Sequence, residues 1–203
     1  KKKFKFSELG KKKLDLTKKY CVKNLKDYVK DGDTIIFISA EAPVKNIKMS
    51  FNNIKMCKNV CQALKNKKLE NLIYLSSDAV YSDVRSKIKE NSLTKPNSLH
   101  GQMHIKREKI LRSCFKKKIC ILRPTLIYGL GDTHNGYGPN QFLSLSMKKK
   151  NITIFGNGEE KRDHIYIEDV IKATLCTLDS QDNVNGKCFN LGSGKGTYLK
   201  DAF

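Results

Sequence analysis

No hydrophobic run in this chain of 203 residues approaches the roughly 20 apolar residues that a membrane-spanning helix needs. The lysine-rich start at 1–5 is not followed by the apolar core of a signal peptide. The seven cysteines are scattered, odd in number and include no Cys-x-x-Cys pair, which favours reduced thiols. We therefore expect a cytoplasmic protein without a membrane partner.

Arginine is also scarce, since only five of the 40 Lys and Arg residues are arginine. The formal net charge of +20 makes nucleic-acid binding one alternative. A protein specialised for binding nucleic acid should contain more arginine, because the planar guanidinium group suits phosphates and base edges. A solvated lysine-rich surface is the favoured interpretation, and its field could steer an anionic substrate toward a cleft.

Short apolar runs alternate with amphipathic, lysine-faced segments, a pattern typical of βαβ units and a parallel sheet. Three continuous apolar runs predict buried strands, at 34–38, 72–75 and 119–122. Between them, the apolar stripe of 51–64 predicts a helix, and a long helix is expected after Pro96. The chain is therefore expected to fold as an α/β protein.

The texture changes after Gly129. Residues 131–140 are rich in turn formers and predict a loop. A short helix at about 141–149, a strand at 152–155 and a glycine turn at 156–158 are expected to follow.

Several motifs occur in a fixed order along the chain. They read Ser-Ser-x-x-Val-Tyr at 76–81, Arg-Pro-Thr-Leu-Ile-Tyr-Gly at 123–129, Arg-Asp-x-x-Tyr at 162–166 and Phe-Asn-Leu-Gly at 189–192. In this order they resemble the extended short-chain dehydrogenase/reductases, that is, the NAD-dependent epimerase/dehydratase family that acts on nucleotide sugars.

The resemblance implies a Rossmann-like, doubly wound parallel sheet that is incomplete at its N-terminal part, with part of a small substrate-binding lobe. Residues 1–130 would form a truncated NAD(P)-binding domain. Residues 131–203 would form part of the substrate-binding region, with a segment that returns to the main domain. The glycine-rich phosphate loop of the family does not precede Asp15, so we expect either a piece of a longer protein or a truncated relative.

A cofactor, NAD or NADP, is also implied by the resemblance. Asp15 would approach the adenine, Ala40 would end the strand beside the cofactor, and Asn53 stands where the family has an asparagine. The other cofactor-binding positions implied in this way are Ser76, His104 and Pro124.

The catalytic pair departs from the family, in which the helix after the serine motif carries Tyr-x-x-x-Lys. Here the same positions are His100 and His104. A tyrosine pKa near 10 is too high for acid/base work at neutral pH, so the family's lysine lowers it. An imidazole, with a reference pKa of about 6.5, can act as a base without that help. Three interpretations stay open: altered acid/base catalysis, relic positions in an inactive binding or assembly module, and a metal site completed by Glu108. Because the family itself usually has a glutamate there, Glu108 requires no metal.

Four further residues are implied as contacts of the nucleotide-linked sugar. Ser77 matches the family's serine or threonine that polarises the substrate oxygen, and Asp78 an acidic residue found in dehydratases and reductases. Arg162 resembles the arginine that clamps the diphosphate, and Asn140 would reach the substrate from its loop. The alternatives are a turn serine, a capping aspartate and an ion pair of Arg162 with Asp163 or Asp169.

The leading expectation is an NAD(P)-dependent epimerase, dehydratase or reductase that acts by hydride transfer at a sugar carbon, with Ser77, His100 and His104 as its catalytic residues. The alternatives are a catalytically inactive binding or assembly module and, more remotely, a basic nucleic-acid-binding protein. A homodimer through the helices near 51–64 and 96–114 would follow the habit of the family.

Overall fold

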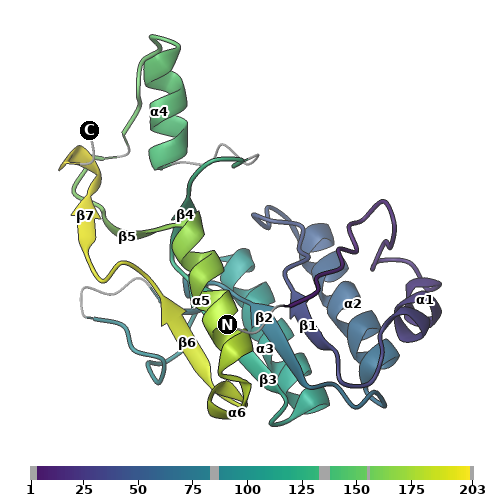
Figure 1. Ribbon diagram of the computed structural model, residues 1–203. Coiled ribbons are helices and arrows are strands. Elements are labelled where there is room, and N and C mark those ends of the chain that lie inside the picture. Colours follow the sequence, from purple (N-terminus) through teal and green to yellow (C-terminus); the bar gives the residue numbers. More distant parts are fainter. Residues whose placement is uncertain (1–3, 83–86, 133–137, 155, 202–203) are drawn as a thin grey trace.

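The computed structural model (Figure 1) describes residues 4–82, 87–132, 138–154 and 156–201. At its centre lies a four-stranded sheet in which every pair of neighbours is parallel. In spatial order its strands are β1 (Thr34–Phe37), β2 (Asn71–Leu75), β3 (Ile119–Pro124) and β6 (Cys188–Leu191). The three strands expected in the first two thirds of the chain are confirmed, as is the α/β fold class.

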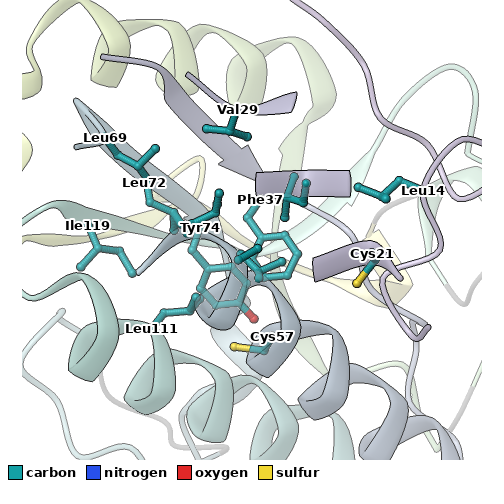
Figure 2. Packing of buried hydrophobic residues seen from close by; sticks show 14 of the residues in the cluster. Leu14, Cys21, Val29, Phe37, Cys57, Leu69, Leu72, Tyr74, Leu111 and Ile119 are labelled. Carbon is teal, nitrogen blue, oxygen red and sulfur yellow. The ribbon is translucent and has the colours of Figure 1, made fainter. Parts of the chain in front are cut away.

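Helices cover both faces of this sheet. One face carries α1 (Cys21–Tyr28), α2 (Ile47–Leu64) and α3 (Leu99–Phe115), and the other carries α5 (Ile167–Asp179) and α6 (Gln181–Val184). Leu72 and Tyr74 of β2 pack in the cluster beneath α1, α2 and α3 (Figure 2). Ile73, between them, packs with Leu178 and Val184 on the opposite face. This alternation gives the doubly wound arrangement of a Rossmann-like fold.

Side-chain caps set where the two long helices begin. The Asn46 carboxamide accepts the Met49 backbone N–H at 3.0 Å, and the Ser98 hydroxyl accepts the Gly101 N–H at 3.1 Å. As a result α2 starts four residues before the predicted 51. No helix in the described part of the chain is long and apolar enough to cross a membrane.

Gly101 brings α3 against the short 3-10 helix η1 (Asp78–Val80), which follows β2. A Cβ built on Gly101 would overlap the carbonyl oxygen of Ala79. Only glycine therefore allows this close approach. The contact sets the serine motif at the end of β2 beside the first turn of α3.

A second, three-stranded sheet lies beyond the carboxyl end of β3. Its strands, in spatial order, are β4 (Leu126–Tyr128), β5 (Lys161–Tyr166) and β7 (Gly196–Tyr198). β4 and β5 are parallel, and β5 and β7 are antiparallel. Beyond them, α4 (Pro139–Met147) stands away from the main sheet (Figure 1). The chain returns to the main sheet through β6, which pairs with β3.

The strand expected at 152–155 is wrong for residues 152–154, which form no regular element, and Phe155 lies outside the described residues. The apolar, β-branched residues Ile152 and Ile154 are only half-buried and have no partner strand. β-propensity reflects packing on a pleated surface, so it does not make a strand without one. The glycine turn is confirmed, because Gly156 and Gly158 both have positive φ, of 57° and 69°.

Candidate functional site

His100 and His104 lie one turn apart on α3, and their rings meet edge to face. The ring centroids are 4.6 Å apart and the planes cross at 83°. The Val44 backbone N–H donates to Nδ1 of His100 at 3.4 Å. Nδ1 of His104 is 2.8 Å from the Tyr74 hydroxyl, which comes from β2. The first two turns of α3 thus hold two imidazoles in contact, one bonded to the segment after β1 and the other to Tyr74 of β2.

Burial keeps this pair neutral. It lowers the pKa of His100, and it lowers the pKa of His104, which is only 5% exposed, to about 2, with smaller contributions from His100 and Arg107. His104 therefore brings no positive charge to the position where the family has lysine.

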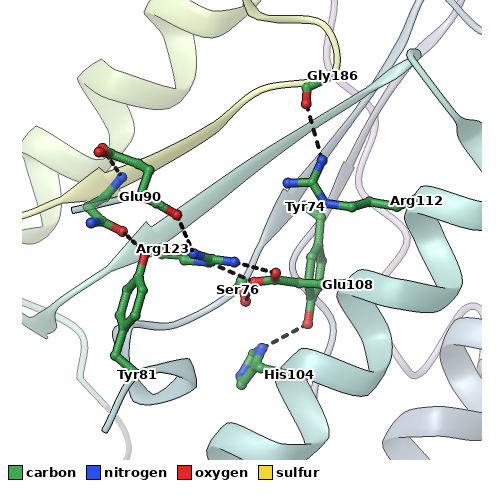
Figure 3. A network of polar contacts seen from close by, with 10 residues as sticks. Tyr74, Ser76, Tyr81, Glu90, His104, Glu108, Arg112, Arg123 and Gly186 are labelled. Atoms are coloured by element: carbon green, nitrogen blue, oxygen red, sulfur yellow. Dashed lines mark hydrogen bonds and ion pairs between the residues drawn. The ribbon is translucent and has the colours of Figure 1, made fainter. Parts of the chain in front are cut away.

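Arg123 and Ser76 are the partners of Glu108. Its carboxylate is paired with the Arg123 guanidinium, with Oε2 to Nη2 at 2.6 Å and Oε1 to Nε at 3.0 Å, and it also accepts the Ser76 hydroxyl at 2.6 Å (Figure 3). Among the described residues, no group of three His, Cys, Asp or Glu side chains could hold a metal ion. The geometry gives the combination of His100, His104 and Glu108 no support as a metal site.

The Arg123 network fastens the serine motif to the sheet. Arg123 Nη1 donates to the Tyr81 hydroxyl at 2.6 Å, and this hydroxyl donates to the Asn190 carboxamide at 2.8 Å (Figure 3). Ser76 is buried and its hydroxyl donates a hydrogen bond to Glu108, so its side chain anchors the end of β2. Pro124, the last residue of β3, is buried beside Leu191 of β6.

Ser77 and Asp78 stand at the carboxyl end of β2. The Ser77 hydroxyl accepts the Ala79 backbone N–H at 3.1 Å and lies 3.2 Å from the Asp78 carboxylate, to which it donates. Burial raises the pKa of Asp78, while Ser77 and the charge of Arg162 oppose the rise. Ser77 is both a cap of η1 and a half-buried hydroxyl at the end of β2.

A cavity of about 200 Å³ opens on the other side of the site, beside the end of β1. It brings together Asp15 and Ala40, which are 25 residues apart in the sequence. Thr17 donates to Oδ1 of Asp15 through its backbone N–H at 2.9 Å and its hydroxyl at 2.6 Å, which lowers the pKa of Asp15. The carboxylate is therefore ionised and fixed in direction. The other lining residues are Lys11, Leu14, Leu16, Thr17, Ser39, Glu41 and Met56.

Asn53 does not line this cavity but holds its wall. Its carboxamide accepts the Glu41 backbone N–H and donates to the Glu41 carbonyl oxygen, both at 3.0 Å. Arg107, fully buried, donates to the Ser39 carbonyl at 2.8 Å, and its guanidinium lies 5.0 Å from the Tyr74 ring centroid. The segment after β1 is thus fixed by two helix residues, Asn53 of α2 and Arg107 of α3.

A second, smaller cavity of about 110 Å³ lies next to Arg162 on β5. Arg162 Nε donates to Oε1 of Glu160 at 2.6 Å, so the ion-pair partner is Glu160 and not Asp163 or Asp169, the two partners weighed from the sequence. Asp163 instead accepts the backbone N–H groups of Ser193 and Gly194. The lining residues are Leu126, Gly138, Glu160, Arg162, His164 and Leu199.

Asn140, the other substrate contact implied by the sequence, lies at the start of α4. Its carboxamide accepts the Gly129 N–H at 3.2 Å and donates to the Gly129 carbonyl at 2.9 Å and to Asp132 at 3.0 Å. In this structure it fixes the turn after β4.

Tyr74 was missed from the sequence, although a signal existed. Tyr74 lies in β2 and Ser76 directly follows the strand, two residues later, so alternation puts both on the face that α3 covers. What the sequence could not give is the register of α3 on that face, which brings the Tyr74 hydroxyl to His104.

Known proteins match this chain over nearly its whole length. The sequence profile of the NAD dependent epimerase/dehydratase family matches residues 5–192. An uncharacterised UDP-glucose epimerase of Bacillus subtilis is 25% identical over 147 residues, which cover 71% of this chain and 46% of that protein. A dTDP-4-dehydro-6-deoxyglucose reductase of Escherichia coli is 33% identical over 138 residues, which cover 64% and 43% of the two proteins.

Solved structures agree with this match. The UDP-glucuronic acid 4-epimerase of Bacillus cereus, in complex with UDP-glucuronic acid and NAD, superimposes with a TM-score of 0.79 at 26% identity over 92% of this chain and 59% of that one. The chain spans about half the length of the curated relatives it matches. By the extent of the profile match, the chain belongs to the NAD-dependent epimerase/dehydratase family.

Proposed function

We propose that this chain carries the substrate side and part of the cofactor side of an NAD(P)-dependent enzyme acting on a nucleotide-linked sugar. The observation that carries the proposal is that η1, which begins directly after Ser77, packs against α3, which carries His100 in its first turn, at the carboxyl end of the parallel sheet. In open α/β sheets, ligands bind at this edge.

The Asp15 cavity fits the adenine end of a dinucleotide. An ionised, fixed carboxylate can accept hydrogen bonds from an exocyclic amine, and the small side chain of Ala40 lines the same cavity. Asn53 supports this wall. Ser76 follows the end of β2, Pro124 ends β3, and His104 faces Tyr74 of β2 from α3. When bound, NAD or NADP would supply the hydride acceptor or donor.

Proton movement falls to the chain's own residues. Ser77 would hydrogen-bond the reacting sugar oxygen and His100 would move its proton, with His104 packed behind it. Because burial lowers the pKa of His100, its neutral form prevails at physiological pH. The Arg162 guanidinium would bind both Glu160 and the diphosphate of the substrate, and Asp78 lies close enough to feel the charge of Arg162. Asn140 would contact the substrate from the start of α4.

The relatives support a nucleotide sugar as substrate, since solved neighbours hold UDP-glucuronic acid or UDP-glucose. The reaction proposed is epimerisation, dehydration or reduction, with NAD or NADP as the cofactor. The same proposal includes a homodimer through α2 and α3, a cytoplasmic location, and a division of the chain into two regions at residue 130.

The test is binding and turnover by the protein that carries this chain. We expect calorimetry to detect NAD(H) or NADP(H) and a UDP- or dTDP-sugar, and we expect turnover to be lost in His100→Ala. Lys172→Gln, which removes an exposed cation paired with Asp169 on α5, is the matched control and should bind as the parent does. Binding of neither dinucleotide would refute the proposal. Binding without turnover would favour the inactive module.

A further inference from the structure

Tyr74 and His104 form a hydrogen bond in the interior of the protein. Tyr74 is 0% exposed, His104 is 5% exposed, and the hydroxyl lies 2.8 Å from Nδ1. The neighbouring Ser76 hydroxyl donates a hydrogen bond to the Glu108 carboxylate. Nδ1 of His104 is the partner of the Tyr74 hydroxyl at this short distance, and Ser76 is a further hydrogen-bonding neighbour that lowers the pKa of Tyr74.

The direction of this hydrogen bond follows from the proton of the tyrosine. A buried O–H that does not donate leaves its proton without an acceptor, which is unfavourable. Burial also raises the pKa of Tyr74, so the hydroxyl keeps its proton. Tyr74 therefore donates, Nδ1 of His104 accepts, and the ring proton of neutral His104 resides on Nε2.

The same reasoning applies to His100. A backbone N–H can only donate, so the Val44 amide requires a bare Nδ1 on His100. Both rings are then Nε2–H tautomers, locked at their Nδ1 atoms by groups from β2 and from the segment after β1. The edge-to-face contact at 4.6 Å joins the two locked rings.

We propose that Tyr74 is a positioning residue of this site: by donating to Nδ1 of His104 it fixes that imidazole as the neutral Nε2–H tautomer, and His104 in turn holds the plane of His100. The catalytic meaning of the inference rests on the proposed function. Where the family uses a charged lysine, this chain uses a buried, uncharged pair that orients rather than attracts.

The surroundings of His104 suit an uncharged ring. On α3 it has His100 and Arg107 one turn away on either side, and β2 contributes Tyr74. The Arg107 guanidinium lies 4.5 Å from the Phe37 ring centroid and 5.0 Å from that of Tyr74, so a fixed positive charge opposes protonation of His104. The Glu108 carboxylate, next to Arg107 in the sequence, forms an ion pair with Arg123.

The experiment reads the tautomers directly, with no cofactor or substrate added. In ¹⁵N-labelled protein, the ring nitrogens of the four histidines are assigned with single His→Gln variants and followed from about pH 5 to pH 8, the range in which an ordinary histidine titrates. We expect His104 to show one Nε2–H tautomer that does not titrate. A proton on Nδ1 of His104, or ordinary titration, would overturn the inference.

Tyr74→Phe then removes the single donor. We expect the His104 ring to become a mixture of tautomers and the titration midpoint of His100 to move toward that of an exposed imidazole. Tyr81→Phe is the matched control, because it removes another hydrogen-bonded hydroxyl, one that contacts Arg123 and Asn190, and should leave both rings unchanged. Unchanged His104 and His100 signals in Tyr74→Phe would contradict the role of Tyr74. If Tyr74→Phe fails to fold, the tautomer of the parent protein still decides.

The two proposals fail separately. Loss of nucleotide binding with the expected tautomers would refute the proposed function and leave the hydrogen-bond assignment standing. Nucleotide binding and turnover with His104 protonated on Nδ1 would do the reverse.

Discussion

The pair of Glu108 and Arg123 offers the sharpest test of how the site is built. Both side chains are about 95% buried, at 5% and 6% exposure, and Glu108 takes hydrogen bonds from both Arg123 and Ser76. Glu108→Gln keeps the volume but removes the negative charge, which leaves a buried guanidinium uncompensated. Breaking a buried pair in this way costs about 3–5 kcal/mol. That is a large part of the 5–15 kcal/mol by which domains are typically stable.

Urea denaturation measures the loss, from the shift of the midpoint at constant slope. The matched control is Glu160→Gln, which breaks the Glu160–Arg162 pair on the surface, where the two side chains are 37% and 41% exposed. Solvent screens such a pair, so we expect a change of about 0–1 kcal/mol. The double variant Glu108→Leu/Arg123→Met should recover much of the stability, because an apolar pair of similar volume needs no compensation. A loss below about 1 kcal/mol in Glu108→Gln, similar to the control, would refute the reasoning from burial.

Three further predictions concern the site. Gly101→Ala should destabilise the protein by about 1–3 kcal/mol, because its Cβ would overlap the Ala79 carbonyl; an unchanged denaturation midpoint would contradict the close contact. Arg162→Met should weaken UDP binding about 10- to 100-fold in calorimetry, from the loss of a charged hydrogen bond of about 1.5–3 kcal/mol, with Lys172→Gln unchanged. His104 has a folded pKa of about 2, far below that of an unfolded histidine, so the unfolded state binds the extra proton and stability falls as the pH drops below about 6.5. Between pH 7 and pH 5 this amounts to about 2 kcal/mol, and His104→Gln should flatten that part of the stability curve; an equally steep curve in the variant would argue against a buried neutral ring.

Periodicity and composition were sufficient for the frame of the fold. The runs around Ile36, Ile73 and Ile121 are apolar on both faces because both faces of the sheet are covered by helices. A continuous apolar run of this kind can be recognised in the sequence alone. The run at 152–154 looks similar but lacks a neighbouring strand, and the presence of a neighbour is a property of the tertiary structure. Local sequence therefore predicted three strands of the main sheet, failed at 152–154, and did not predict the paired strands β4, β5 and β7 of the second sheet.

The site was predictable to the extent that motifs mark strand ends. The resemblance put Asp15 and Ala40 near one cofactor, and the structure gives them a common cavity. The choice of Glu160 as partner of Arg162, and the contact of Tyr74 with His104, depend on side-chain directions across separate elements. Spacing along one element does not contain that information.

Arg107 has a consequence for how changes in this protein combine. One fully buried cation holds the Ser39 carbonyl at the wall of the Asp15 cavity and also lies against Tyr74, which holds His104. A substitution that shifts the cavity wall must therefore displace the same guanidinium that borders the imidazole pair. The free-energy effects of mutations at the cavity wall and at the imidazole pair, on the proposed dinucleotide binding and proton transfer, should therefore not be additive. Substitutions in the two regions are expected to be tolerated in combination rather than singly.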